Sequence, residues 1–235
     1  MTEAPVLMPR SRPEVRPFGA EDVEHYLGCA VAAFTATGYR PRDELTYVLY
    51  NVAGAQVGRF ALRDDRTLFL FVFRCPAPQS VHNAEDVRAL LRARFETVGW
   101  ECRPILEQLE SASDVYFDAV SQIRSDHWSR GRVVLLGDAA AAVSLLAGEG
   151  TGLAMLEGYV LAGELARASG DHRIAFDAYE RRLRTFVADK QRSAYTFLPF
   201  FTATTRLGLG LRNLGLRTMS IRALAKLLAS RSFRD

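Results

Sequence analysis

Four short runs rich in β-branched and aromatic residues follow one another in the first third of the chain. They cover residues 31–36, 45–50, 56–62 and 67–73. The links at 51–55 and 63–66 are too short for a crossover helix, so the sequence predicts an antiparallel meander. The last run is apolar on both faces, and we expect other elements to cover it. Its alternating Phe69, Phe71 and Phe73 favour core packing over the lining of an aromatic substrate cavity.

Two helices and one more strand are predicted after the meander. Asn83 is a candidate helix cap, with Asp86 three residues later and apolar residues at helical spacing from Val87 to Val98. A second helix is expected over residues 103–111, and a strand over residues 115–123. The chain shows no internal repeats.

The pattern changes at residues 133–136, a short and wholly apolar run that ends in Gly137 and Asp138. Such a run suits a buried strand of a parallel sheet. A loop of small residues then leads into a predicted helix over residues 151–168, which Gly170 ends. Asp171 is the candidate cap of a further helix.

Composition excludes several classes of protein. The 235 residues are 49% hydrophobic and 24% charged, which is typical of a globular chain, and no apolar run is long enough to cross a bilayer. A formal charge of +3 gives no reason to expect nucleic acid as a partner. The amino terminus lacks a signal-peptide pattern, and three widely spaced cysteines suit a reducing compartment, so we expect a cytoplasmic protein. The four histidines are scattered, and no metal site is predicted.

The segment from Gly131 to Ala154 is the one stretch with the chemistry of a binding site. It predicts a strand ending in an acid, then a glycine-rich turn that opens a helix. Asp138 could hold a polyol at the carboxyl end of the strand, and free amides at a helix start near Gly150 could hold an electron-rich atom. The alternative is a strand-to-helix turn whose glycines only permit tight packing.

The same segment resembles a known motif. Trp128-Ser-Arg-Gly-Arg-Val-Val-Leu-Leu-Gly-Asp138-Ala-Ala, followed by Leu146-Ala-Gly-Glu-Gly-Thr-Gly-Leu-Ala154, is similar to the second flavin motif of FAD-dependent monooxygenases of the para-hydroxybenzoate hydroxylase type. The resemblance covers about residues 18–200 and is most specific over 117–165. Alanine at 141, leucine at 145, glutamate at 149 and glycine at 152 depart from the family's usual residues.

The resemblance implies FAD as cofactor and NAD(P)H as the reductant of the complete enzyme. It implies that Asp138 binds the ribityl chain and that the helix-start amides face the N1–C2=O edge of the flavin. The implied cofactor-binding residues are Gly137, Asp138, Gly148, Gly150, Thr151 and Gly152. No residue is assigned as catalytic, and the implied substrate is a small organic ring compound.

One expected part of the family's pattern is missing. The chain contains no GxGxxG, the motif that grips the ADP half of FAD, and no Asp-Gly dipeptide. We therefore expect that it needs a separate or missing amino-terminal half. Because such a chain leaves strand edges and an apolar face exposed, it should bind FAD weakly alone and self-associate.

The implied fold class is α/β, or α+β as a fragment, with an antiparallel substrate-domain sheet followed by the last strand and helices of a doubly wound FAD-binding domain. The expected divisions are a disordered lead-in at 1–17, a substrate-domain-like sheet with helices at 18–125, the end of the FAD-binding domain at 126–200 and a basic helical tail at 201–235. In that tail, helix packing is favoured over contact with a membrane surface, because three glycines interrupt it.

The expected function is that of an FAD-dependent monooxygenase-like oxidoreductase, truncated relative to its family. In its complete form such an enzyme hydroxylates an organic ring substrate with NAD(P)H and oxygen. The alternative is a non-catalytic remnant, or a module for apolar ligands that lacks tight FAD binding.

Overall fold

The computed structural model describes residues 6–7 and 23–219. The strands are β1 (Val6–Leu7), β2 (Glu24–Thr37), β3 (Tyr47–Val52), β4 (Ala55–Ala61), β5 (Arg66–Arg74), β6 (Val115–Ile123), β7 (Ser129–Arg130) and β8 (Val133–Val134). The helices are α1 (Ala84–Phe95), α2 (Cys102–Ser111), α3 (Asp138–Ala141), α4 (Gly150–Arg167), α5 (His172–Phe201) and α6 (Arg206–Met219), with a 3-10 turn, η2, at Leu145–Ala147.

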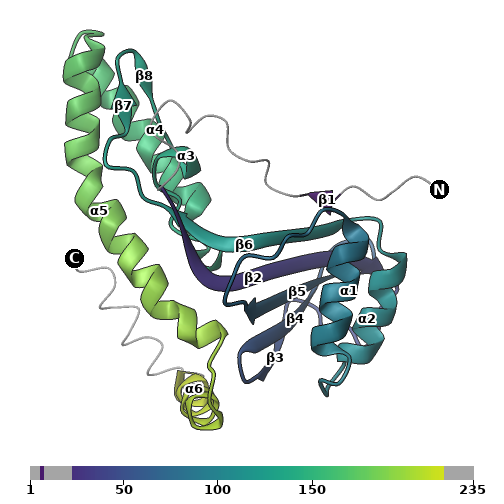
Figure 1. Cartoon of the computed structure of the whole chain (residues 1–235). Helices are drawn as coiled ribbons and strands as arrows, with labels where there is room; N and C mark the ends of the chain where they lie inside the picture. The colour runs from purple at the N-terminus through teal and green to yellow at the C-terminus, as the bar shows by residue number, and fades with distance from the viewer. Residues whose placement is uncertain (1–5, 8–22, 220–235) are drawn as a thin grey trace.

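A six-stranded sheet forms the larger part of the molecule (Figure 1). Its order is β1-β6-β2-β5-β4-β3, and every neighbouring pair is antiparallel except the two-residue pairing of β1 with β6. The predicted meander is confirmed for β3, β4 and β5, which pair in sequence order. For the run at 31–36 it is wrong, because β2 pairs with β5 and β6 and not with β3. Pairing at Val6–Leu7 was not predicted; the rest of the expected lead-in, residues 1–5 and 8–17, lies outside the described residues.

Strand β2 is longer than the predicted run at 31–36, and it begins seven residues earlier, at Glu24. A register shift between Tyr26 and Cys29 interrupts the pairing of β2 with β6, and Gly28 lies there with φ +76°. A bulge at this point bends the strand and breaks its alternation of side chains. The same long strands, β2 and β6, carry the sheet toward the α3 and β7–β8 region (Figure 1).

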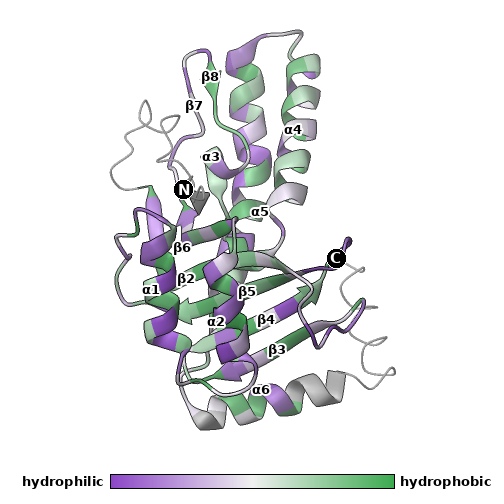
Figure 2. Ribbon diagram, turned by 90° about the vertical axis from the view of Figure 1, so that its right-hand side faces the viewer, coloured by the Kyte–Doolittle hydropathy of each residue, from purple (hydrophilic) through white to green (hydrophobic). Residues whose placement is uncertain are grey.

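Both faces of β5 are covered, as its apolar pattern predicts. On one face, Phe69, Phe71 and Phe73 are fully buried against α1 and α2, and Phe95 of α1 contacts two of these rings edge-on. They are therefore core residues. On the other face, Val72 packs in a cluster that includes Leu198 of α5. Figure 2 shows α1 and α2 lying over the sheet and α4 and α5 extending from its far end.

The α1 helix begins where the sequence predicts. The Asn83 side chain accepts a hydrogen bond from the Asp86 backbone N–H at 2.9 Å, and Asp86 accepts one from the His82 N–H at 2.8 Å. Helix α2 and strand β6 also agree with their predicted ranges within a residue. At the carboxyl end of α4, Asp171 caps α5 by accepting from the Arg173 N–H.

Residues 128–187 form a second core, in which a hairpin and three helices pack around Tyr179. The apolar run at 133–136 does not enter a parallel sheet among the described residues. Instead β8 pairs antiparallel with β7, and the Val133 side chain is 56% exposed. A parallel strand needs a neighbour that its own sequence does not specify, so the apolar run alone could not establish one.

The long helix α5 joins the second core to the sheet. It begins at His172 beside α4 and ends at Phe201, where Thr202 packs against Cys29 of β2. Helix α6 then follows, and its Arg212 side chain donates to Asn51 of β3 at 2.6 Å. The expected tail is thus helical over 206–219, and residues 220–235 lie outside the described part. Within that described part, no helix combines the length and apolar character that crossing a bilayer requires.

Candidate functional site

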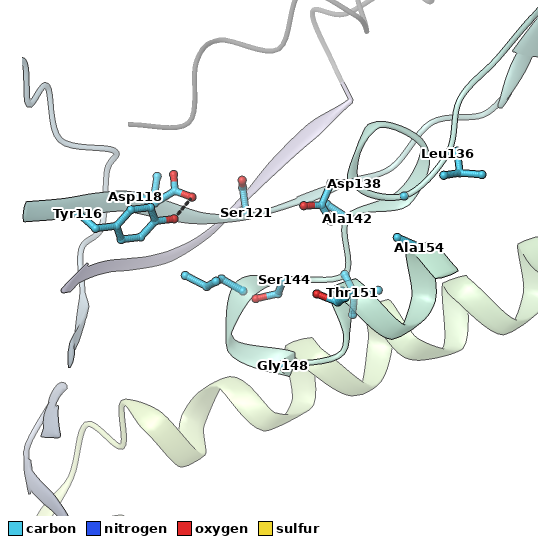
Figure 3. Close-up of a pocket in the computed structure, with 15 residues that line it drawn as sticks. Tyr116, Asp118, Ser121, Leu136, Asp138, Ala142, Ser144, Gly148, Thr151 and Ala154 are labelled. Atoms are coloured by element: carbon cyan, nitrogen blue, oxygen red, sulfur yellow. Dashed lines mark hydrogen bonds between the residues drawn. The ribbon is translucent and has the colours of Figure 1, made fainter. Parts of the chain in front are cut away.

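A cleft of about 910 Å³ lies between the outer face of β6 and the segment that joins α3 to α4 (Figure 3). One wall comes from the sheet and the other from turns and a helix start. The lining residues are Tyr116, Asp118, Ala119, Ser121, Leu136, Gly137, Asp138, Ala142, Val143, Ser144, Leu145, Gly148, Gly150, Thr151 and Ala154.

Gly137 allows the turn that places Asp138 in this cleft. Its backbone has φ +62° and ψ −138°, a conformation nearly confined to glycine. A Cβ atom at Gly137 would also lie 3.1 Å from the Cβ of Ala154, a tight contact that Ala154 would have to relieve by a few tenths of an ångström. Helix α4 also approaches Asp138 from its first turn, because a Cβ at Gly150 would be 3.7 Å from Asp138 Oδ1. The Asp138 carboxylate therefore lies over the start of α4.

A tight loop presents the amino terminus of α4 to the cleft. The Ser144 hydroxyl accepts from the Leu146 N–H at the start of η2, and Gly148 ends that turn in the left-handed conformation. Helix α4 then begins at Gly150, and Glu149 makes no side-chain cap hydrogen bond. The first-turn N–H groups of this 18-residue helix and the positive end of its dipole are suited to an acceptor.

Two buried glutamines hold the floor of the cleft. Gln122 of β6 donates to the carbonyls of Val143 and Gln191, at 2.7 and 2.8 Å. Gln191 of α5 donates in turn to the carbonyls of Ile123 and Ala142. These side chains bond backbone acceptors of the loop at 142–143, of β6 and of α5, and so fix the loop to both the sheet and the helix.

The sheet wall carries polar side chains. Tyr116 donates to Asp118 Oδ2 at 3.1 Å on the outer face of β6 (Figure 3). On the same strand, Ser121 donates to Glu24 at 2.7 Å. The wall thus offers hydroxyl and carboxylate groups across the cleft from the glycine-rich turn. A ligand held between the two walls would meet backbone on one side and side chains on the other.

The site residues that the sequence predicts come together in large part. Gly137, Asp138, Gly148, Gly150 and Thr151 all line the cleft. Gly152 does not, and a Cβ there would meet nothing within 4 Å.

Sequence reasoning missed Tyr116, Asp118 and Glu157. The first two could have been found from their alternation with buried Val115 and Phe117, which marks them as one strand face. Glu157 is one of two acids within the mostly apolar helix α4, the other being Glu164, and it is 1% exposed. Burial raises the pKa of its carboxyl and the Asp138 charge adds to this, while hydrogen bonds from Gly137 and Tyr179 act against it.

Comparison with known proteins identifies the family. The family described as "FAD binding domain" matches residues 34–194. A flavin-dependent monooxygenase of unknown prokaryotic origin is 36% identical over 172 residues, which are 71% of this chain and 43% of the relative. The chain therefore spans less than half the length of that relative.

Solved structures share the fold. The tetracycline destructase Tet(55) superimposes with a TM-score of 0.71 at 30% identity, over 78% of this chain and 49% of the other. Klebsiella pneumoniae HpxO, solved with FAD and uric acid, gives a TM-score of 0.70 over 87% of this chain and 53% of HpxO; at 21% identity it supports the fold alone. On its match to the family over residues 34–194, the chain belongs to the FAD-binding domain family, alongside flavin-dependent monooxygenases.

Proposed function

We propose that this chain supplies the flavin-holding carboxyl-terminal part of an FAD-dependent monooxygenase that hydroxylates a small organic ring compound. The observation that carries the proposal is the cleft itself. It places the Asp138 carboxylate and the start of α4 on one wall, opposite the polar face of β6 on the other.

The residues of the cleft fit FAD by their chemistry. The Asp138 carboxylate is an acceptor suited to the hydroxyls of a ribityl chain. The N–H groups at Gly150 and Thr151 are donors, backed by the positive end of α4, and suit the N1–C2=O edge, where negative charge gathers on reduction. Gly137, Gly148 and Gly150 have no side chains, which lets a flat ring system approach the backbone.

The sheet wall is the proposed place for substrate. Tyr116 and Asp118 face the cleft from β6 and can hydrogen-bond the polar groups of a ring compound. Bound FAD, reduced by NAD(P)H, would supply the oxygen chemistry, while this chain orients the substrate and keeps water out. The name of a relative that is 36% identical, a flavin-dependent monooxygenase, supports this class of reaction.

A dinucleotide-binding half is the proposed partner of α4. On the side of α4 away from α5, Met155 and Tyr159 are 73% and 81% exposed. A helix that is apolar on two sides is normally buried on both. We propose that a unit with the missing GxGxxG motif packs on this face and holds the ADP part of FAD.

FAD titration of the full chain tests the proposal, with flavin fluorescence as the readout. Asp138→Ala should weaken the measured affinity about tenfold or more, because a hydrogen bond to a charged group is lost. The control is Asp114→Ala, at an exposed aspartate outside the cleft, which should leave the affinity unchanged. Equal affinities of wild type and Asp138→Ala would contradict the assignment. Absence of flavin binding even with a dinucleotide-binding half present would favour the non-catalytic alternative.

A further inference from the structure

Glu157 is an acid in a place where acids are rare. It lies on the face of α4 that packs toward α5, among the buried side chains of Leu153 and Val160, and is 1% exposed. Ionised carboxylates are costly to bury unless they are bonded to something. A buried carboxylate at this position therefore requires hydrogen-bond donors close to it.

That partner is the turn that carries Asp138. Glu157 Oε2 accepts a short hydrogen bond from the Gly137 N–H and a longer one, 3.5 Å, from the Tyr179 hydroxyl. The same hydroxyl lies 3.3 Å from the Leu135 carbonyl oxygen. Glu157 and Tyr179 together thus bind the backbone on both sides of Leu136. Glu157 Oε1 is buried and makes no hydrogen bond within the described part of the chain.

These contacts fix a backbone that helix geometry alone would leave free. Gly137 is the residue before α3, so its N–H has no intrahelical acceptor. Helix α4 contacts Gly137 at two positions three residues apart, Ala154 against its Cα and Glu157 at its N–H. Residues at this spacing share one helix face, so both contacts act on the same side of the turn.

We propose that Glu157 is the positioning residue of this site, which holds the Gly137 amide and thereby directs the Asp138 side chain into the cleft. The proposal rests on the proposed function only in taking FAD as the group that Asp138 binds. Glu157 itself does not line the cleft, so it acts through the turn and does not touch the ligand.

The charged and titratable groups around Glu157 come from three elements. Asp138 of α3 opposes its ionisation, the Tyr179 hydroxyl of α5 favours it, and Glu164 lies two turns along α4 and pairs with Arg167 and Arg182. Because burial outweighs the favourable bonds, the pKa of Glu157 is raised, and the Gly137 amide should sense its titration.

The test uses nitrogen-15 spectra of the full chain. As pH rises through the Glu157 titration, the Gly137 amide proton should move downfield, because its acceptor becomes charged. In Glu157→Gln, which keeps an acceptor oxygen, the Gly137 resonance should stay in place over the same pH range. Glu164→Gln is the matched control, since it changes a buried acid on the same face of the same helix, and it should retain the wild-type shift.

The second readout is FAD affinity. Glu157→Leu should bind FAD about tenfold more weakly than Glu157→Gln, because the glutamine side chain can still accept from the Gly137 N–H and the leucine side chain cannot. If Glu157→Leu does not fold, the comparison of Glu157→Gln with wild type by the amide shift decides alone. A Gly137 shift that does not respond to pH in wild type, or responds equally in Glu157→Gln, overturns the proposal. The amide readout needs no flavin, so failure of the proposed function would be seen separately.

Discussion

Gly131 and Gly137 have nearly the same positive φ, +61° and +62°, but different surroundings. A Cβ at Gly131 would meet nothing within 4 Å, while one at Gly137 would lie 3.1 Å from Ala154. Both glycines share a positive φ, while Gly137 adds a ψ of −138° that is nearly confined to glycine and a tight approach to Ala154. Only Gly137 also lines the cleft.

We expect Gly137→Ala to destabilise the protein by about 2–4 kcal/mol, because a strained backbone and a tight contact add. Gly131→Ala should cost about 1 kcal/mol from the backbone alone. Urea unfolding of both variants measures the difference. If the two substitutions cost the same, neither the ψ of Gly137 nor its approach to Ala154 has energetic weight.

A second expectation at this scale concerns pH. Because the pKa of Glu157 is raised in the folded state, the folded chain binds this proton more tightly than the unfolded chain. The stabilisation is full below the ordinary glutamate pKa and is lost as pH rises through the folded value. The unfolding free energy of wild type should therefore fall relative to Glu157→Gln as pH rises above about 4.3. Denaturant unfolding at several pH values checks this. An unfolding free energy of wild type that rises with pH relative to that of Glu157→Gln would contradict it.

Helices and strands that follow from a local sequence pattern were predictable, and features that depend on pairing with a distant strand of the chain were not. Strands β3, β4 and β5 follow from alternation and short links, and α1 follows from its cap at Asn83. The bulge near Gly28 hid the start of β2, and the apolar run at β8 was assigned to the wrong kind of sheet.

The candidate site divides in the same way. Asp138 and its glycines could be recognised because a contiguous motif carries them. The alternation of β6 marks Tyr116 and Asp118 as one strand face, but which segment lies opposite that face depends on tertiary packing, as does the place of Glu157 between α4 and α5. Contacts between distant segments leave no mark at a fixed spacing in the sequence.

The cap of α1 gives a test at the scale of one element. Asn83→Ala removes the side-chain acceptor of the Asp86 N–H and should cost about 1 kcal/mol of unfolding free energy. Asn83→Ser keeps an acceptor and should cost only a few tenths of that amount. Thermal or urea unfolding distinguishes them, and equal losses would show that the cap bond contributes nothing.

For the whole molecule, the exposed face of α4 predicts self-association of the chain alone. Met155 and Tyr159 lie one turn apart and are both largely exposed. Sedimentation velocity of wild type should show a concentration-dependent increase in mass, because apolar faces of this kind associate. Met155→Lys with Tyr159→Lys should shift the chain toward monomer.

The control for this prediction is Tyr195→Lys, at an aromatic residue of α5 that is 59% exposed and lies away from α4's open face. It should leave the association unchanged. A wild-type chain that remains monomeric at all concentrations would refute the prediction. If a dinucleotide-binding half is added, the same two α4 substitutions should prevent its binding, as measured by co-purification.

Helix α5 fixes both the distance between the two cores and the relative rotation of the side chains that it places in them. Its 30 residues span about 45 Å, with Tyr179 and Leu183 in the second core near one end and Leu198 against the sheet near the other. Each added residue would turn one end by about 100° relative to the other. A single insertion between Val187 and Leu198 would therefore rotate Leu198 off the sheet. Only insertions close to a whole number of helical turns keep both ends of α5 facing their cores, and seven residues, about two turns, is the shortest that does so closely.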